Sequence, residues 1–325
     1  MIRTASVAAM ALVLCVSVAH VDAATIRGKV VDASGKPMEG VTVSAFDEAH
    51  QKSISVFSQA DGSFTIDGLR DATFKVRARL LGQLDEWQED VGVGATGVSF
   101  AMKPATGEDL EDQRTADSGF GMLKFDSAKD KENYKMMCTY CHQSGSRGWR
   151  TPEEPVDWET MIRRMDGFGG LYEHTQETLV KRIVETYTDD AVAEWPAFVP
   201  LPAPKGAATR VKITEWDMGE QFKVMIHDLE LGSDGLIYAV DMAKNAVVTL
   251  DPATGERGIY PFPGKNRGPH SIERDNDGNM WFTLCFSGEM AKFDVKTKEF
   301  TITSSAVSPA KRGAYPHTLR INPKD

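Results

Sequence analysis

The pattern of hydrophobic and polar positions changes twice along the chain. Between residues 25 and 103 apolar and polar side chains alternate with a period of two, and turn sequences such as Ser34-Gly35-Lys36-Pro37 separate the runs. This pattern predicts an antiparallel β-sandwich over residues 24–104. Residues 105–127 are polar and acidic and are predicted to form a linker. Helical spacing then predicts an all-α domain over residues 128–203, which a Pro-rich run ends.

Beyond residue 209 the chain repeats itself. His227-Asp228-Leu229-Glu230 aligns with His270-Ser271-Ile272-Glu273 at an offset of 43 residues, and a third copy starts at Pro316-His317. A period of this length with four short strands per unit is typical of propeller blades. Residues 204–325 are therefore predicted to be a partial β-propeller with two full blades and the start of a third. Since propellers use roughly four to eight blades, we expect the sequence to be a truncated version of a longer protein.

The predicted fold class is therefore multidomain: an all-β sandwich, then an all-α domain, then an all-β propeller fragment. Residues 1–23 contain Arg3, an apolar run and small residues at Val21 and Ala23, which predict a signal peptide cleaved after Ala23. The apolar run is too short to span a bilayer comfortably, and no later segment approaches the required length. We expect a periplasmic or secreted protein without a membrane span.

Charge and composition narrow the partners. The 325 residues carry a formal net charge of −10 and no basic cluster, which argues against nucleic acid as a partner. The acidic balance is explained either by solubility or by a basic redox partner.

Cys138-Thr139-Tyr140-Cys141-His142 is the motif that carries the clearest chemistry. Two thiols at this spacing can each form a thioether to a porphyrin, and the adjacent imidazole can ligate the iron. A redox disulfide or half of a zinc site is the alternative, but zinc needs a second ligand pair, and Cys15 and Cys285 are each isolated. The sequence thus predicts one haem c held by Cys138 and Cys141, with His142 as the proximal iron ligand.

The distal ligand is less clearly defined. Met161 and Met165 share a face of the predicted helix at residues 156–166, and a thioether is a common axial partner of histidine. We expect Met165 to be the ligand, with Met161 as the alternative. A methionine stripe on an amphipathic helix can equally be core packing, and an open iron or His174 remains possible in principle.

Two of the three segments resemble known families with a fold role and a redox role. The turns Gly28-x-Val30-x-Asp32, Gly35-x-Pro37 and Asp61-Gly62-x-Phe64 make residues 24–104 resemble the carboxypeptidase regulatory-like family, a transthyretin-like sandwich. Three helices around Cys138–His142 resemble a class I cytochrome c domain. That resemblance implies electron transfer, with a redox partner protein or a small electron carrier as partner.

The repeats resemble the streptogramin lyase (virginiamycin B lyase-like) propellers through Gly268-Pro269-His270-Ser271-Ile272 and Asp277-Gly278-Asn279-Met280-Trp281. The family implies a Mg²⁺-dependent lyase that uses His and Glu side chains. This chain has Leu284 where the family often has Glu, which weakens the catalytic inference. His270 and His317 are either lyase candidates or structural residues at strand starts. A third hypothesis is a scaffold that binds a polymer or peptide ligand and carries a haem. We expect electron transfer and leave enzyme activity open.

Overall fold

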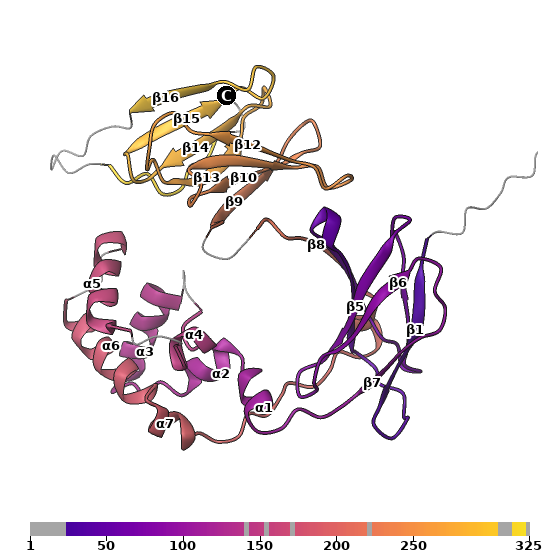
Figure 1. Ribbon diagram of the computed structural model, residues 1–325. Coiled ribbons are helices and arrows are strands. Elements are labelled where there is room, and N and C mark those ends of the chain that lie inside the picture. Colours follow the sequence, from indigo (N-terminus) through magenta and orange to yellow (C-terminus); the bar gives the residue numbers. More distant parts are fainter. Residues whose placement is uncertain are drawn as a thin grey trace, which may run out of the picture.

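The computed structural model describes residues 24–139, 143–152, 156–169, 173–219, 223–304 and 314–322 (Figure 1). In this part of the chain, four β-sheets flank a run of helices. Two of the sheets form an N-terminal sandwich and two form a pair of blade-like sheets near the C-terminus. None of the described helices has both the length and the apolar character needed to cross a bilayer.

The sandwich consists of a three-stranded and a five-stranded sheet. The first sheet has the order β4 (Ser63–Ile66), β1 (Ile26–Asp32) and β7 (Val98–Met102), and β1 pairs parallel to β7 and antiparallel to β4. The second has the order β6 (Glu86–Gly92), β5 (Thr73–Arg79), β2 (Thr42–Asp47), β3 (Lys52–Phe57) and β8 (Lys212–Trp216). A short 3₁₀ turn, Glu48–His50, joins β2 to β3.

The period of two in the sequence builds the core of this sandwich. In β5, Phe74, Val76 and Ala78 are buried, while the residues between them face outward. Each fully buried side chain of this kind stabilises the fold by about 1.5 to 3 kcal/mol. Gly28 on β1 lies so close to β7 that an added Cβ would stand 1.9 Å from the Val98 carbonyl oxygen. Only glycine therefore allows β1 and β7 to approach as they do.

Strand β8 lies more than a hundred residues after β7, yet it completes the sandwich by pairing antiparallel with β3. The chain between them is held to the sandwich at both ends. The Gly82 amide donates to Gln113 Oε1 at 2.7 Å where the chain leaves, and the Gly206 amide donates to Glu39 Oε1 at 2.7 Å where it returns. The helical segment is thus inserted between two strands of the sandwich. The predicted propeller segment, residues 204–325, begins before β8, so its first strand belongs to the other sheet.

Helices occupy the insertion. They are α1 (Glu108–Asp112), α2 (Ala116–Gly121), α3 (Ala128–Tyr134), a π-helical turn (Lys135–Thr139), α4 (Arg147–Arg150), α5 (Trp158–Gly169), α6 (Glu173–Thr186), α7 (Asp189–Ala193) and a 3₁₀ turn (Gly206–Arg210). Residues 105–127, predicted as a linker, contain α1 and α2, and Phe120 and Leu123 are buried there.

The fold class predicted from the sequence is wrong, because the described residues do not form an all-α cytochrome c domain between two β domains. Four of the seven described α-helices contain six residues or fewer, and only α5 and α6 contain more than seven. β-sheets dominate the described chain. Helical spacing reports local helix alone, so it could not show that the helices are a minor insertion into a sandwich.

The 43-residue repeat corresponds to two antiparallel four-stranded sheets. The first contains β9 (Ile226–Leu231), β10 (Ile237–Asp241), β11 (Ala246–Leu250) and β12 (Arg257–Pro261), and the second contains β13 (Pro269–Arg274), β14 (Met280–Leu284), β15 (Glu289–Phe293) and β16 (Phe300–Ser304). Tyr238, Phe262, Phe282 and Phe293 pack in the core between them. Residues 314–322, the described part of the third copy, contain no assigned strand.

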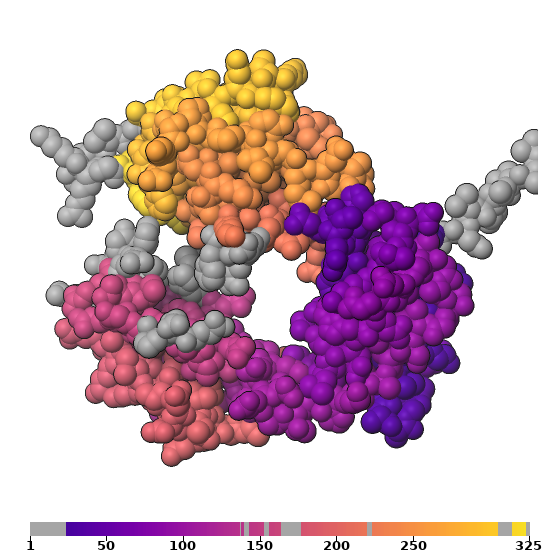
Figure 2. All heavy atoms as spheres, viewed as in Figure 1, coloured from indigo at the N-terminus to yellow at the C-terminus, as the bar shows by residue number. Residues whose placement is uncertain are grey.

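Figure 2 shows the sandwich, the helical segment and the blade-like sheets as three masses around an opening. The first blade-like sheet contacts the sandwich through Arg257, whose guanidinium donates to the carbonyl oxygens of Gln51 at 3.3 Å and Asp217 at 2.8 Å. The Asp217 amide in turn donates to the Gln51 carbonyl at 2.8 Å. One buried-edge guanidinium therefore joins the sandwich turn, the segment after β8 and the first blade.

Candidate functional site

Cys138 is the one residue of the Cys-x-x-Cys-His motif that the structure describes; Cys141 and His142 lie outside the described residues. Ser127 caps α3 by accepting the Asp130 amide at 3.1 Å, and α3 continues into the π-helical turn that carries Cys138. The Thr139 hydroxyl donates to the Lys135 carbonyl at 2.7 Å and closes this turn. Cys138 is 6% exposed. The helix thus directs the first thiol of the motif into the interior.

An aromatic and aliphatic cluster surrounds Cys138. Its ring pairs include Phe120 and Tyr134, with centroids 5.4 Å apart, and Trp149 and Trp158, 5.1 Å apart. The buried members are Phe120, Leu123, Tyr134, Cys138, Ile162, Leu179, Ile183 and Tyr187, and Phe125, Trp149, Trp158, Val180 and Trp195 pack against them. Such an environment excludes water and holds large flat groups well.

The loop that follows the motif is pressed against α2. A Cβ on Gly119 would stand 2.1 Å from the Gly145 carbonyl oxygen, so the two backbones touch where no side chain fits. Ser144 is buried beside this contact. The sequence showed only a Gly-containing loop here, whereas the structure shows that two glycines set the position of the chain directly after His142.

Two buried hydroxyls lie next to Cys138. Within the described chain, Tyr134 Oη and Ser144 Oγ are buried and make no hydrogen bond of good geometry. Burial raises the pKa of Tyr134 well above its usual value, and the nearby Ser144 hydroxyl offsets this pKa shift in part. Buried polar groups are normally satisfied, so these two hydroxyls are available to a bound group.

The structure separates the two methionines in part. Both lie in α5, where Ile162 is buried in the cluster. Met161 is 39% exposed and so faces solvent at least in part. The side chain of Met165 lies outside the described residues, as does that of His174. Neither distal ligand is therefore located.

Sequence reasoning missed two buried arginines in the helical segment. Arg114 donates to Glu111 Oε2 at 2.9 Å and to the Pro196 carbonyl at 2.7 Å. Arg150 donates to the Arg114 carbonyl at 2.9 Å, and burial lowers the pKa of Arg150. These bonds tie α1, α4 and the Pro-rich run together. Only the rule that buried charges are paired could have pointed to them, and that requires knowledge of burial.

The repeated histidines form a ladder across the blade-like sheets. His227 Nδ1 lies 2.9 Å from the His270 carbonyl oxygen, and His270 Nδ1 lies 2.9 Å from that of His317. The ring centroids are 3.7 Å and 3.9 Å apart. A carbonyl accepts only, so each Nδ1 carries the proton and Nε2 holds the lone pair. The repeat that the sequence revealed therefore has a structural role in joining the sheets.

The electrostatics of this ladder keep its centre neutral. Burial, together with the neighbouring His227 and His317, lowers the pKa of His270 to about 4. Asp228 Oδ2 accepts from the Ser271 hydroxyl at 3.1 Å and adds a second contact between the sheets. In the described part of the chain, no group of three or more His, Cys, Asp or Glu side chains is placed to hold a metal ion.

Comparison with known proteins identifies the sandwich. Residues 25–103 match the carboxypeptidase regulatory-like domain, so the sequence prediction for this segment is confirmed. No curated protein matches the chain.

Solved structures that resemble the chain include virginiamycin B lyase from Staphylococcus aureus, with 18% identity, a TM-score of 0.28, and coverage of 33% of this chain and 34% of that one. A streptogramin B lyase structure has 23% identity, a TM-score of 0.28, and coverage of 34% and 35%. Hydrazine synthase of Kuenenia stuttgartiensis has 15% identity, a TM-score of 0.26, and coverage of 34% and 30%. The chain thus spans about a third of each of these structures. Similarity at this level carries no argument about function.

Proposed function

We propose that this protein binds one haem covalently through Cys138 and Cys141, with His142 as the proximal iron ligand, and passes single electrons through it. The observation that carries the proposal is the burial of Cys138, 6% exposed, among the aromatic residues of the helical segment. A Cys-x-x-Cys-His motif is typical of c-type haem attachment. A reactive redox cysteine is instead expected to be partly exposed in electropositive surroundings.

The surroundings of Cys138 suit a porphyrin in chemistry. Aromatic rings such as Phe120 and Trp149 belong to the cluster around Cys138 and can shield a flat apolar group from water. The buried hydroxyls of Tyr134 and Ser144 can donate to its polar edge. When bound, the haem supplies the one-electron chemistry, and burial and hydrogen bonding from the protein set its reduction potential.

For the distal position we propose Met165, with Met161 as the alternative. Both belong to α5, whose buried face contributes Ile162 to the cluster around Cys138. The exposure of Met161, 39%, favours Met165, because an axial thioether must lie in the water-excluded interior.

We propose further that residues 1–23 are a signal peptide and that the protein acts in the periplasm or outside the cell. Haem is joined to such motifs after export in bacteria, so the signal and the motif support each other. The partner is then a redox protein or a small electron carrier.

Visible spectroscopy of the purified, exported full-length chain tests the proposal. We expect covalent c-type haem bands that shift reversibly with a chemical reductant and oxidant. Cys138→Ser combined with Cys141→Ser should abolish them, and Cys285→Ser should leave them unchanged, since Cys285 lies in the blade core. Met165→Ala should convert low-spin to high-spin iron, and Met161→Ala is the matched control. Full retention of covalent haem without Cys138 and Cys141 would refute the proposal.

The alternative, a Mg²⁺-dependent lyase, has less support. The rings of His227 and His270 use Nδ1 to join neighbouring strands, and the described residues contain no cluster of acidic and histidine side chains arranged for a metal.

A further inference from the structure

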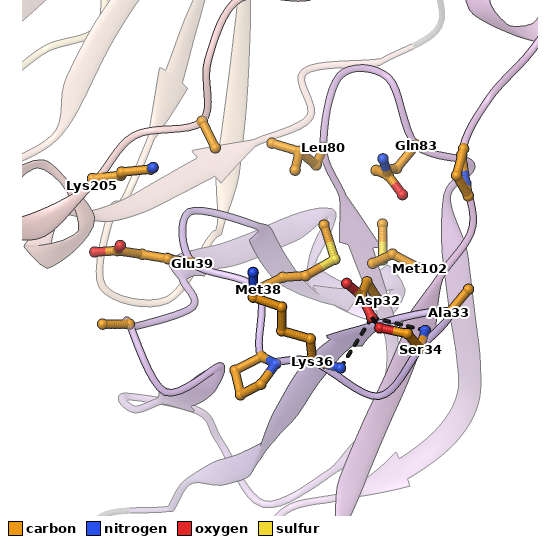
Figure 3. A pocket seen from close by; sticks show the side chains of 14 residues that line it. Asp32, Ala33, Ser34, Lys36, Met38, Glu39, Leu80, Gln83, Met102 and Lys205 are labelled. Atoms are coloured by element: carbon orange, nitrogen blue, oxygen red, sulfur yellow. Dashed lines mark hydrogen bonds between the residues drawn. The ribbon is translucent and has the colours of Figure 1, made fainter.

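The largest cavity among the described residues lies at one end of the sandwich, far along the chain from the haem motif. It is a cleft of about 680 Å³ between the β1–β2 turn, the β5–β6 turn, the end of β7 and the returning segment at residues 203–205 (Figure 3). This volume falls in the range of ligand sites, roughly 300 to 1,000 Å³. The cleft exists only because the chain after the helical segment runs back along the sandwich.

The floor of the cleft is apolar. Met38, Leu80 and Met102 come from three different segments, and Figure 3 shows their side chains converging. Met102 is fully buried, while Met38 and Leu80 are half-buried. Methionine is flexible and polarisable, and it accommodates apolar groups of different shape. The floor therefore suits an aliphatic side chain.

The rim of the cleft carries two carboxylates that the protein itself already uses. Asp32 Oδ1 accepts from the Ser34 amide at 2.8 Å and the Lys36 amide at 3.0 Å, which fixes the β1–β2 turn. Glu39 Oε1 accepts from the Gly206 amide at 2.7 Å, which fixes the returning segment. Both carboxylates thus have a structural task.

The two lysines of the rim have no such task. Within the described chain, the ammonium groups of Lys36 and Lys205 form neither an ion pair nor a hydrogen bond. Lys36 comes from the β1–β2 turn and Lys205 from the returning segment, and in Figure 3 both side chains extend toward the cleft. Two uncommitted cations on either side of an apolar floor call for a ligand with the opposite charge at both ends.

We propose that this cleft binds an extended acidic peptide segment of a partner protein, with carboxylates on Lys36 and Lys205 and an aliphatic side chain on Met38, Leu80 and Met102. In an extended peptide, residues i, i+2 and i+4 lie on one face. An acidic, an aliphatic and a second acidic residue at these positions present the required groups together. The site is independent of haem binding.

The test is fluorescence anisotropy with the full-length chain and a labelled peptide Glu-Ser-Leu-Ser-Glu. We expect saturable binding that weakens at higher salt. Lys36→Glu combined with Lys205→Glu should weaken it about tenfold or more. Lys29→Glu combined with Lys265→Glu introduces the same charge change at two exposed lysines outside the cleft, and it should change binding less than about twofold. Circular dichroism of each variant confirms that it is folded.

A second variant tests the floor without a change of charge. Leu80→Ala should weaken binding of Glu-Ser-Leu-Ser-Glu several-fold, since it removes apolar area from the contact, and it should not affect binding of Glu-Ser-Ser-Ser-Glu. Four results would overturn the proposal: no saturable binding, tighter binding of Lys-Ser-Leu-Ser-Lys, equal loss in both lysine pairs, or stronger binding of an acidic polysaccharide such as alginate than of the peptide.

Discussion

His270 shows how burial decides the chemistry of a single residue. Its ring lies between His227 and His317 and donates from Nδ1 to the His317 carbonyl. The pKa of His270 is about 4 in the fold, compared with about 6.5 in an unfolded chain. Because the unfolded state binds the proton more readily, His270 contributes stability that is complete above about pH 6.5 and is lost as the pH falls toward 4.

We therefore expect the free energy of unfolding of the C-terminal sheets to fall by about 1 to 2 kcal/mol between pH 7 and pH 4 through this residue, with solvent screening taken into account. Urea unfolding of the wild type and of His270→Asn at both pH values measures it. Asparagine retains a donor for the His317 carbonyl but does not titrate in this range. An equal pH dependence in the two proteins would contradict this role.

At the level of elements, the contact between α2 and the loop after the haem motif depends on two glycines. Gly119→Ala would place a methyl group 2.1 Å from the Gly145 carbonyl oxygen, so we expect destabilisation of about 1 to 3 kcal/mol. Gly121→Ala in the same helix meets no atom within 4 Å and should be neutral or stabilising by about 0.5 kcal/mol. Thermal unfolding followed at 222 nm compares them. Similar losses in both variants would show that this contact is unimportant.

The same elements show how much the sequence could predict. Strict alternation in β5 and the turn residues after β1 reveal the sandwich, because a half-buried strand must alternate. The offset between His227 and His270 reveals the two blade-like sheets. The pairing of β8 with β3 was not predictable, since strand pairing at long sequence separation leaves no local pattern. The burial of Cys138 and of Arg114 also depends on contacts that only the folded chain creates.

For the candidate site, the sequence supplies the chemistry and the structure supplies part of the environment. Cys-x-x-Cys-His was visible at once, because its spacing is a covalent requirement. The aromatic cluster around Cys138 draws Phe120 from a segment predicted as a linker and Tyr187 from the far end of α6. Short helices with few apolar residues give weak periodic signals, which explains why α1 and α2 were missed.

At the scale of the whole molecule, Arg257 holds the first blade-like sheet to the sandwich. Arg257→Ala removes donors from the carbonyl oxygens of Gln51 and Asp217, and loss of such a charged donor costs about 1 to 3 kcal/mol. We expect faster amide exchange at residues 50–52 and 217 by hydrogen–deuterium exchange mass spectrometry. Arg274→Ala, at an exposed position on β13, is the control. Unchanged exchange in Arg257→Ala would show that other contacts hold the two parts together.

The insertion of the helical segment into the sandwich has a consequence for function. A haem at Cys138 would be tethered at both ends to a rigid β-scaffold, through Gln113 on one side and Gly206 on the other. The acidic-peptide cleft lies where the chain returns to that scaffold. The account therefore places a redox group and a partner site on one framework.

The most direct test of the central claim is the intact mass of the exported full-length protein under denaturing conditions. The account predicts that the mass of one haem stays attached, that Cys138→Ser combined with Cys141→Ser removes it, and that Cys285→Ser retains it. A mass that corresponds to the polypeptide alone, from cells that mature other c-type cytochromes, would contradict the account.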